Sequence, residues 1–262
     1  MFDIINAFYH QTLLELSLNS VRVSSKRQLL FRLLTLRRHL VEVAIHNILY
    51  VRQVYPADLF HRRRKYDVAV WRSRHPELNE YISGAVKAVG EELILGTIER
   101  VIIVIKDPKD VPLERFIFSI KQMVQLESYD RDERITGAMP ANTLSQYFRA
   151  FLVKLSMVES QLGPLLEDDP SFTIIIELED DKIPLASQQK GDPPPWMPAS
   201  KEHTTEGATE NAELHFVRAV DTGVINLSLA VQESEAKLTR TNDWFGANVK
   251  GKEKGKGKER AV

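Results

Sequence analysis

Apolar residues recur at helical spacing in three segments of the chain. The first starts at Leu40, is apolar on nearly every side, and is expected to end before Pro56, because the residue before a proline disfavours helix. The second starts at Pro76, a residue suited to the first helical turn, and the third runs from about Thr143 to Gln161. A helix that is apolar almost all round is buried on several sides. The pattern therefore predicts three main helices around one core.

A second pattern, typical of β-strands, falls between and after these helices. Arg100–Lys106 contains five consecutive β-branched residues, which favours a central strand covered on both faces. Asp107–Asp110 has turn chemistry, and Leu113–Lys121 then alternates apolar and polar side chains. Further strands are predicted at Tyr66–Val70, Ser171–Leu178, Leu214–Val220 and Val224–Val231. Three helices packed on a mostly antiparallel sheet make an α+β domain.

The polarity of the chain divides it into a domain and two flanking regions. Residues 1–39 form an extension with a basic, leucine-rich part, which either packs on the domain or contacts a partner or a membrane surface. Residues 40–231 hold all the predicted core elements. Within them, residues 180–213 are polar and too poor in large apolar side chains to order themselves alone. Residues 232–262 are predicted to be a disordered Lys-rich tail.

The composition excludes several classes of protein. The 262 residues include no cysteine, which excludes thiolate catalysis, Cys-ligated metals and disulfides, and favours a reducing compartment. The formal net charge of -1 argues against a nucleic-acid footprint over the whole domain. No run reaches the ~18 apolar residues that a membrane span needs. We therefore expect a soluble, intracellular protein.

Motifs for catalysis or cofactor binding are missing from the sequence. It contains no GxGxxG after a strand, no GxxxxGK[ST], no HExxH and no GxSxG. The seven histidines are scattered, and none pairs with a carboxylate at metal-ligand spacing. The acidic doublets Asp168–Asp169 and Asp180–Asp181 flank a predicted strand and are interpreted as solvating its ends. We predict no catalytic residue, no metal and no cofactor.

Three features of the sequence are each compatible with two interpretations. The basic run from His61 to Lys65 suits a nucleic-acid patch or nuclear-import signal, but also the solvated entry to a strand. Tyr81 lies beside the buried stripe of the second helix, where it either borders the core or faces a groove. Trp196, in DPPPWMP, either docks back on the domain or anchors a partner. An aromatic anchor typically contributes ~2–4 kcal/mol to binding.

Several blocks of sequence carry a resemblance to a known family. EVAIHNILYVRQVYP, FHRRRKYDV, HPELNEYI, ERVIIVIKD and LSQYFRAFLVKLS resemble the HORMA-domain family, in particular its branch that forms the non-catalytic subunit of DNA polymerase zeta. The resemblance covers roughly residues 40–231. The chain departs from the family around Ser17–His39, which look inserted into the first helix, either as a real insertion or as a translated intron.

The resemblance implies a mechanism and a set of site residues. In the family a C-terminal safety belt, here about residues 180–231, closes over a partner peptide that joins the sheet as a strand. Tyr81 and Trp196 match the family's aromatic contacts to a proline-containing peptide of the polymerase's catalytic subunit. The other matched positions are Arg149 and Lys154 for pairing between two HORMA domains, and Leu214, Ser228 and Ala230 for the C-terminal domain of a translesion scaffold polymerase. Ser228 and Ala230 replace a glutamine and a tyrosine of the family's pattern.

These implications predict an adaptor rather than an enzyme, located in the nucleus or in both the nucleus and the cytoplasm. It would hold the catalytic subunit of DNA polymerase zeta, bridge it to the scaffold polymerase for damage tolerance, and meet DNA only indirectly. A HORMA adaptor of the mitotic checkpoint or the meiotic axis, trapping other peptides, is the alternative within the fold. A direct DNA-binding protein that uses the basic run and the tail is the alternative from another class, and an unrecognised hydrolase has no residues to support it.

Overall fold

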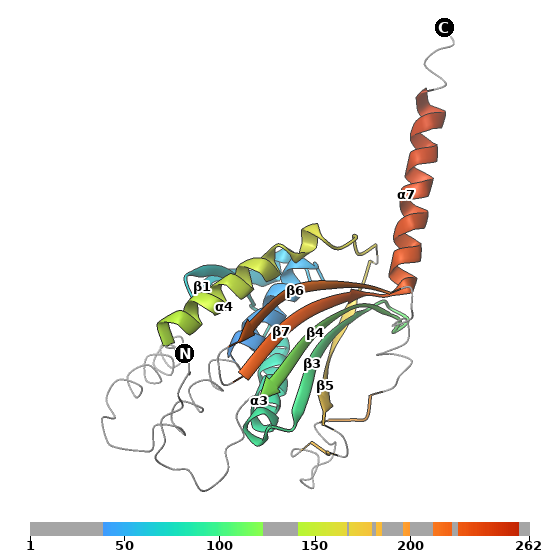
Figure 1. Cartoon of the computed structure of the whole chain (residues 1–262). Coiled ribbons are helices and arrows are strands. Elements are labelled where there is room, and N and C mark those ends of the chain that lie inside the picture. The colour runs from blue at the N-terminus through green and yellow to red at the C-terminus, as the bar shows by residue number, and fades with distance from the viewer. Residues whose placement is uncertain are drawn as a thin grey trace, which may run out of the picture.

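A five-stranded antiparallel sheet in the order β5-β3-β4-β7-β6 forms the centre of the computed structural model (Figure 1). The structure describes residues 39–122, 141–166, 168–179, 182–184, 196–199, 212–221 and 225–256. Its strands are β3 (Ile98–Lys106), β4 (Pro112–Gln122), β5 (Ser171–Leu178), β6 (Glu213–Asp221) and β7 (Ile225–Glu233). The predicted extension at 1–39 and most of the predicted belt between 180 and 212 lie outside the described residues.

Helices cover one face of this sheet. They are a helix at 39–51, α3 (Pro76–Leu95) and α4 (Ala141–Ser156), with short 3-10 turns η1 (Ala57–Leu59) and η2 (Val158–Ser160). The core cluster joins their apolar stripes to alternate residues of β3, β4, β5 and β7. The predicted α+β class and its three main helices are confirmed.

Strand β3 follows the prediction for a strand buried on both faces. Its residues from Val101 to Ile105 are at most 1% exposed. Val101 and Ile103 lie opposite Phe118 and Phe116 of β4, so the large rings of β4 point to the same face as these β3 side chains. The middle of the sheet is nevertheless β4 rather than β3.

The helix at 39–51 is buried and holds a separate hairpin. Leu40, Ala44, Ile45 and Ile48 are fully buried, and the neighbouring polar residues His46 and Asn47 face the hairpin. Asn47 Oδ1 accepts a hydrogen bond from the Trp71 N–H at 2.9 Å, and His46 Nδ1 accepts a longer one from Ser73 at 3.5 Å. Burial first, and then the charge of nearby Arg72, lower the pKa of His46 to about 4. His46 is therefore a neutral, hydrogen-bonded core residue.

The hairpin corrects the predicted strand at Tyr66–Val70. Two strands, β1 (Phe60–Lys65) and β2 (Val68–Ser73), pair antiparallel, and Tyr66 and Asp67 form the turn with φ of 48° and 59°. Two consecutive positive φ angles are the geometry that twisted two-residue hairpins require. The basic run is thus itself a strand, which the sequence pattern hid because its side chains are nearly all polar.

A C-terminal helix corrects the predicted disorder of residues 232–262 over residues 235–256, whereas residues 257–262 lie outside the described residues. Helix α7 (Glu235–Lys256) follows β7 directly and extends away from the sheet (Figure 1). Arg240 on α7 bonds Asp107 at 2.9 Å in the turn between β3 and β4. Although burial alone would raise it, the Val111 N–H and the Arg240 guanidinium hold the pKa of Asp107 below its usual value. Within the described part of the chain, no helix combines the length and hydropathy of a membrane span.

Candidate functional site

Strand β5 leaves one edge of the sheet unpaired. Among the described strands it pairs only with β3, whereas β6 forms the opposite edge. The chain leaves the sheet at Leu178 and re-enters it at Glu213, so the residues between them connect the two edges. Four inter-strand spacings make this crossing roughly 19 Å wide. An unpaired strand offers a row of backbone N–H and C=O groups to another extended chain.

Three aromatic rings line the start of this free edge. Phe172 of β5 meets Tyr81 of α3 edge-to-face at 5.7 Å between ring centroids, and Tyr55 at 6.2 Å. The Tyr81 hydroxyl accepts a long hydrogen bond, 3.5 Å, from the backbone N–H of Ile174 on β5. Burial, and then the nearby Tyr81 and Asp169, raise the pKa of Tyr55. Tyr81 remains 47% exposed, so its ring is open to a partner.

Sequence reasoning singled out Tyr81 but missed Tyr55 and Phe172. The alternation of apolar residues along Ser171–Leu178 predicts only that Phe172 packs against the core, and nothing in the sequence indicates its contacts with Tyr55 and Tyr81. Tyr55 precedes the proline that ends the first helix, and only the fold brings it beside β5. The aromatic edge is defined here as Tyr55, Tyr81 and Phe172.

Trp196 packs against the border of the core. Its side chain is half-buried and belongs to the apolar residues that contact the core cluster. The next residue, Met197, is 76% exposed. The indole therefore docks on the domain, which was one of the two interpretations open from the sequence.

The two residues predicted for domain pairing lie on the outward side of α4. Arg149 and Lys154 are exposed. Phe148, which precedes Arg149, and Leu152, which lies between the two, are buried. Two exposed apolar residues, Val153 and Met157, follow on the same side, with 42% and 57% exposure.

The three residues predicted for the scaffold polymerase share one face of the sheet. Ser228 and Ala230 alternate with buried Leu229 on β7, so they point away from the core. Phe216 of β6 lies opposite Ala230, and Leu214 is two residues before it on the same face. Leu214 and Phe216 are 63% and 66% exposed. Phe216 was not nominated from the sequence, although the alternation of its strand already placed it beside Leu214.

A buried group of charges joins four parts of the fold at the end of β7. The anchor cluster is defined as Arg52, Glu114, Gly163, Glu233 and Lys237. Arg52 contacts Glu114 through Nε at 2.9 Å and through Nη2 at 2.5 Å. Lys237 contacts Glu114 at 2.5 Å and also pairs with Glu233. The two cations balance the two carboxylates.

Gly163 completes the anchor cluster through its backbone. Its carbonyl accepts hydrogen bonds from Arg52 at 2.8 Å and from Lys237 at 2.9 Å, and its N–H donates to Glu233 at 3.0 Å. Because Glu114, near the start of β4, lies opposite Glu233 at the end of β7, the cluster depends on the pairing of these two strands. It therefore fastens the β6–β7 hairpin and α7 to the rest of the domain.

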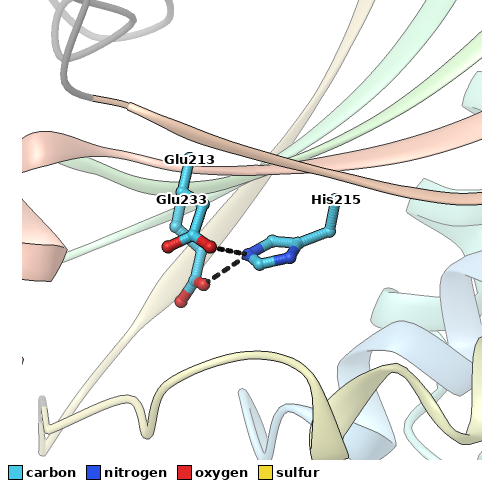
Figure 2. Close-up of side chains that lie close together, drawn as sticks. All are labelled: Glu213, His215 and Glu233. Carbon is cyan, nitrogen blue, oxygen red and sulfur yellow. Dashed lines mark hydrogen bonds and ion pairs between the residues drawn. The ribbon is translucent and has the colours of Figure 1, made fainter.

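Glu213, His215 and Glu233 bring three potential metal-ligand atoms within 4.8 Å of one another. Figure 2 shows both carboxylates turned toward the imidazole nitrogen of His215. The Nε2 atom of His215 lies 2.9 Å from Glu233 and 3.9 Å from Glu213. The sequence analysis predicted no metal ligand, because Glu233 reaches this group only through the register of β6 and β7.

The chain is similar in sequence to several curated proteins. The spindle assembly checkpoint protein MAD2B of Danio rerio is 30% identical over 206 residues, which cover 75% of this chain and 89% of that protein. The DNA polymerase zeta processivity subunit of Schizosaccharomyces pombe is 36% identical over 139 residues, covering 53% of this chain and 65% of that protein. The MAD2B of Gallus gallus is 37% identical over 139 residues, and the chain spans 61% of its length.

Solved structures share the fold. A chain of the mitotic checkpoint complex superposes with a TM-score of 0.60 at 19% identity, over 77% of this chain and 98% of that one. The Caenorhabditis elegans protein HTP-1, bound to a motif of HTP-3, superposes with a TM-score of 0.59 at 11% identity, over 77% of this chain and 90% of that one. The family model described as the HORMA domain matches residues 34–224. The chain belongs to the HORMA-domain family.

Proposed function

We propose that this protein is a non-catalytic subunit that traps a proline-containing peptide of the catalytic subunit of DNA polymerase zeta. Two kinds of observation support the proposal. The S. pombe relative is named a processivity subunit of that polymerase. The free edge of β5, bordered by the aromatic edge, offers main-chain pairing next to aromatic side chains, of which Tyr81 is exposed. Peptides bound by strand addition use main-chain pairing for affinity and side-chain pockets for specificity.

The single observation that carries the proposal is the crossing from β5 to β6. A peptide paired with β5 lies at the edge where the connecting segment begins, and the segment ends at the opposite edge. Closure of that segment over the peptide makes release depend on its opening rather than on contact area alone. In this proposal residues 180–231 act as the safety belt and Trp196 as its aromatic contact.

Peptide binding tests the proposal directly. The probe is a synthetic peptide of about twenty residues from the catalytic subunit of the same organism, centred on its proline motif. Tyr81→Ala and Trp196→Ala are each expected to cost ~2–4 kcal/mol, or roughly 30- to 1,000-fold in Kd. Trp244→Ala is the matched control, since Trp244 is 46% exposed but lies on α7. Equal affinity for the peptide in the wild type and in all three variants would reject the site.

The outer face of β6 and β7 is proposed as the surface for the scaffold polymerase's C-terminal domain. Leu214 and Phe216 supply exposed apolar area, and the small Ser228 and Ala230 leave those side chains uncovered. Leu214→Glu is expected to abolish binding of that domain while leaving peptide binding unchanged. Loss of both activities together would instead indicate damage to the fold.

Pairing with a second HORMA domain is proposed for the outward side of α4, with Arg149 and Lys154 as its charged contacts. Arg149→Ala is expected to lower the mass of the peptide-bound protein in light scattering from dimer to monomer. A mass that is the same for the wild type and the variant would reject this surface.

One observation favours direct binding to nucleic acid as a second candidate function. Three arginines, Arg62, Arg63 and Arg64, are exposed side by side on β1, so positive charge is concentrated on this hairpin. Phosphate contacts would make the affinity for DNA fall steeply with salt. A salt-dependent affinity that disappears in Arg63→Gln would support it, and no DNA binding at low salt would reject it. A nuclear location is common to both candidates.

A further inference from the structure

The group formed by Glu213, His215 and Glu233 has the arrangement of a strand-borne ligand set. Glu213 and His215 are two residues apart on β6, so their side chains leave the same face of the sheet. Glu233 of β7 lies directly opposite Glu213 in the register of the two strands. The side chains of Glu233, His215 and Glu213 are 3%, 18% and 61% exposed. The group is thus fixed at its base and open to solvent on one side.

The charges of this group are not satisfied by hydrogen bonds within it. The single Nε2 of His215 faces both carboxylates, and one N–H can donate to only one of them. The contact with Glu233 has hydrogen-bond length, whereas Glu213 stays at 3.9 Å. Two carboxylates that share a site repel each other, and a dication placed among the three atoms relieves that repulsion.

The buried member of the group is already oriented by its surroundings. One carboxylate oxygen of Glu233 is held by Lys237 and by the Gly163 N–H. The other oxygen is directed at His215. Outer contacts of this kind fix the direction of a metal ligand before the metal arrives. Lys237 also places a positive charge nearby, which weakens binding of a cation and argues for a reversible site rather than a permanent one.

We propose that Glu213, His215 and Glu233 form a Zn²⁺ site. One imidazole nitrogen and two carboxylate oxygens are donors that Zn²⁺ takes, and three protein ligands leave a fourth position for water or a partner's side chain. Zinc–ligand distances near 2.0–2.2 Å require Glu213 to move toward His215, and its exposure permits that movement. Mg²⁺ is a poor match, because it prefers oxygen ligands alone.

A metal ion at this site would connect the start of β6 to the end of β7. Glu213 and His215 open the strand that follows the crossing segment, and Glu233 ends its partner strand. A bound ion would tie these two ends together and slow the opening of the β6–β7 hairpin. This edge of the sheet is opposite β5, so the site is separate from the proposed peptide edge.

Titration of the full chain with Zn²⁺ alone tests the proposal. Competition with a chromophoric indicator is expected to give one saturable site per chain, with no competition from Mg²⁺. Glu213→Gln and His215→Ala should each weaken binding by more than about tenfold, since even loss of an outer-shell partner costs roughly 10–100-fold. The matched controls Glu99→Gln and His39→Ala remove an exposed carboxylate and another imidazole, and should leave binding unchanged.

Hydrogen exchange provides a second measurement that does not depend on the indicator. Zn²⁺ should slow amide exchange in residues 212–221 of the wild type and leave it unchanged in Glu213→Gln. Equal Zn²⁺ affinity in all five proteins, or no saturable site in the wild type, would overturn the proposal. Because Glu213 is 61% exposed on an edge strand, Glu213→Gln is expected to fold, and its melting curve without metal checks this.

Discussion

Replacing Lys237 by methionine tests whether the anchor cluster holds the C-terminal elements in place. The substitution removes the ammonium that contacts Glu114, Glu233 and the Gly163 carbonyl. Methionine keeps an apolar, flexible side chain in the space of the lysine stem, so the loss of packing is small. Two carboxylates that are 0% and 3% exposed are then left with the single guanidinium of Arg52.

The expected loss follows from this imbalance of charge. Removing one partner of a buried ion pair typically costs ~3–5 kcal/mol, because the remaining charge stays buried without compensation. Arg52 still contacts Glu114, and the Gly163 N–H still contacts Glu233, so we expect the lower end, about 3 kcal/mol. Adding Glu233→Gln to Lys237→Met restores the balance and should recover at least ~1 kcal/mol.

Urea unfolding of the full chain measures these differences through midpoints at a common slope. Lys106→Met is the matched control, since Lys106 pairs with Asp110 at the same four-residue spacing, 2.7 Å apart, but with Asp110 56% exposed. An exposed pair is worth ~0–1 kcal/mol. Equal losses for Lys237→Met and Lys106→Met would refute the reasoning, as would a double variant less stable than Lys237→Met.

Three further predictions follow from single residues. Because the pKa of His46 is lowered to about 4 from 6.5, the unfolded state binds more protons between these values, so stability should fall as pH drops from 6.5 toward 4. His46→Gln should flatten that part of a stability–pH curve, and an unchanged curve would contradict it. Asp67 has a φ of 59°, which glycine adopts without steric cost, so Asp67→Gly should stabilise the protein by roughly 0.5–1 kcal/mol in urea unfolding, and a loss of stability would contradict this. Tyr81→Phe keeps the ring on Phe172 and should retain peptide affinity that Tyr81→Ala loses; equal losses would assign the effect to the hydroxyl.

Periodicity predicted the elements whose stability comes from apolar packing. The helix at 39–51, α3, and the β3–β4 hairpin all carry apolar stripes at their own repeat, and their predicted residues are buried. The prediction failed where polar interactions decide. Tyr66 and Asp67 turn because of backbone geometry, and α7 is held against the sheet by the contact of Lys237 with Glu114, a residue far away in sequence. No local pattern reveals the contact with Glu114, although Ser234, whose hydroxyl accepts a hydrogen bond from the Lys237 N–H, is a local signal for the start of the helix.

The candidate site residues also fall into two groups, those that the sequence predicted and those that only the fold brings together. Leu214, Ser228 and Ala230 come together because strand alternation fixes which face each side chain takes, and the family pattern already pointed to those positions. Phe172 and Glu233 acquire their neighbours from the order and register of the strands, which the sequence alone did not supply.

Hydrogen exchange of β5 with and without the catalytic-subunit peptide tests the central claim most directly. If the peptide joins the sheet as a strand beside β5, the outward amides of Ser171–Leu178 become protected, apart from that of Ile174, which already donates to the Tyr81 hydroxyl. The protection should persist for as long as the belt stays closed, and it should shorten in Trp196→Ala. If the peptide instead slows amide exchange in β6 or β7 and leaves exchange in β5 unchanged, the peptide does not bind by strand addition to β5.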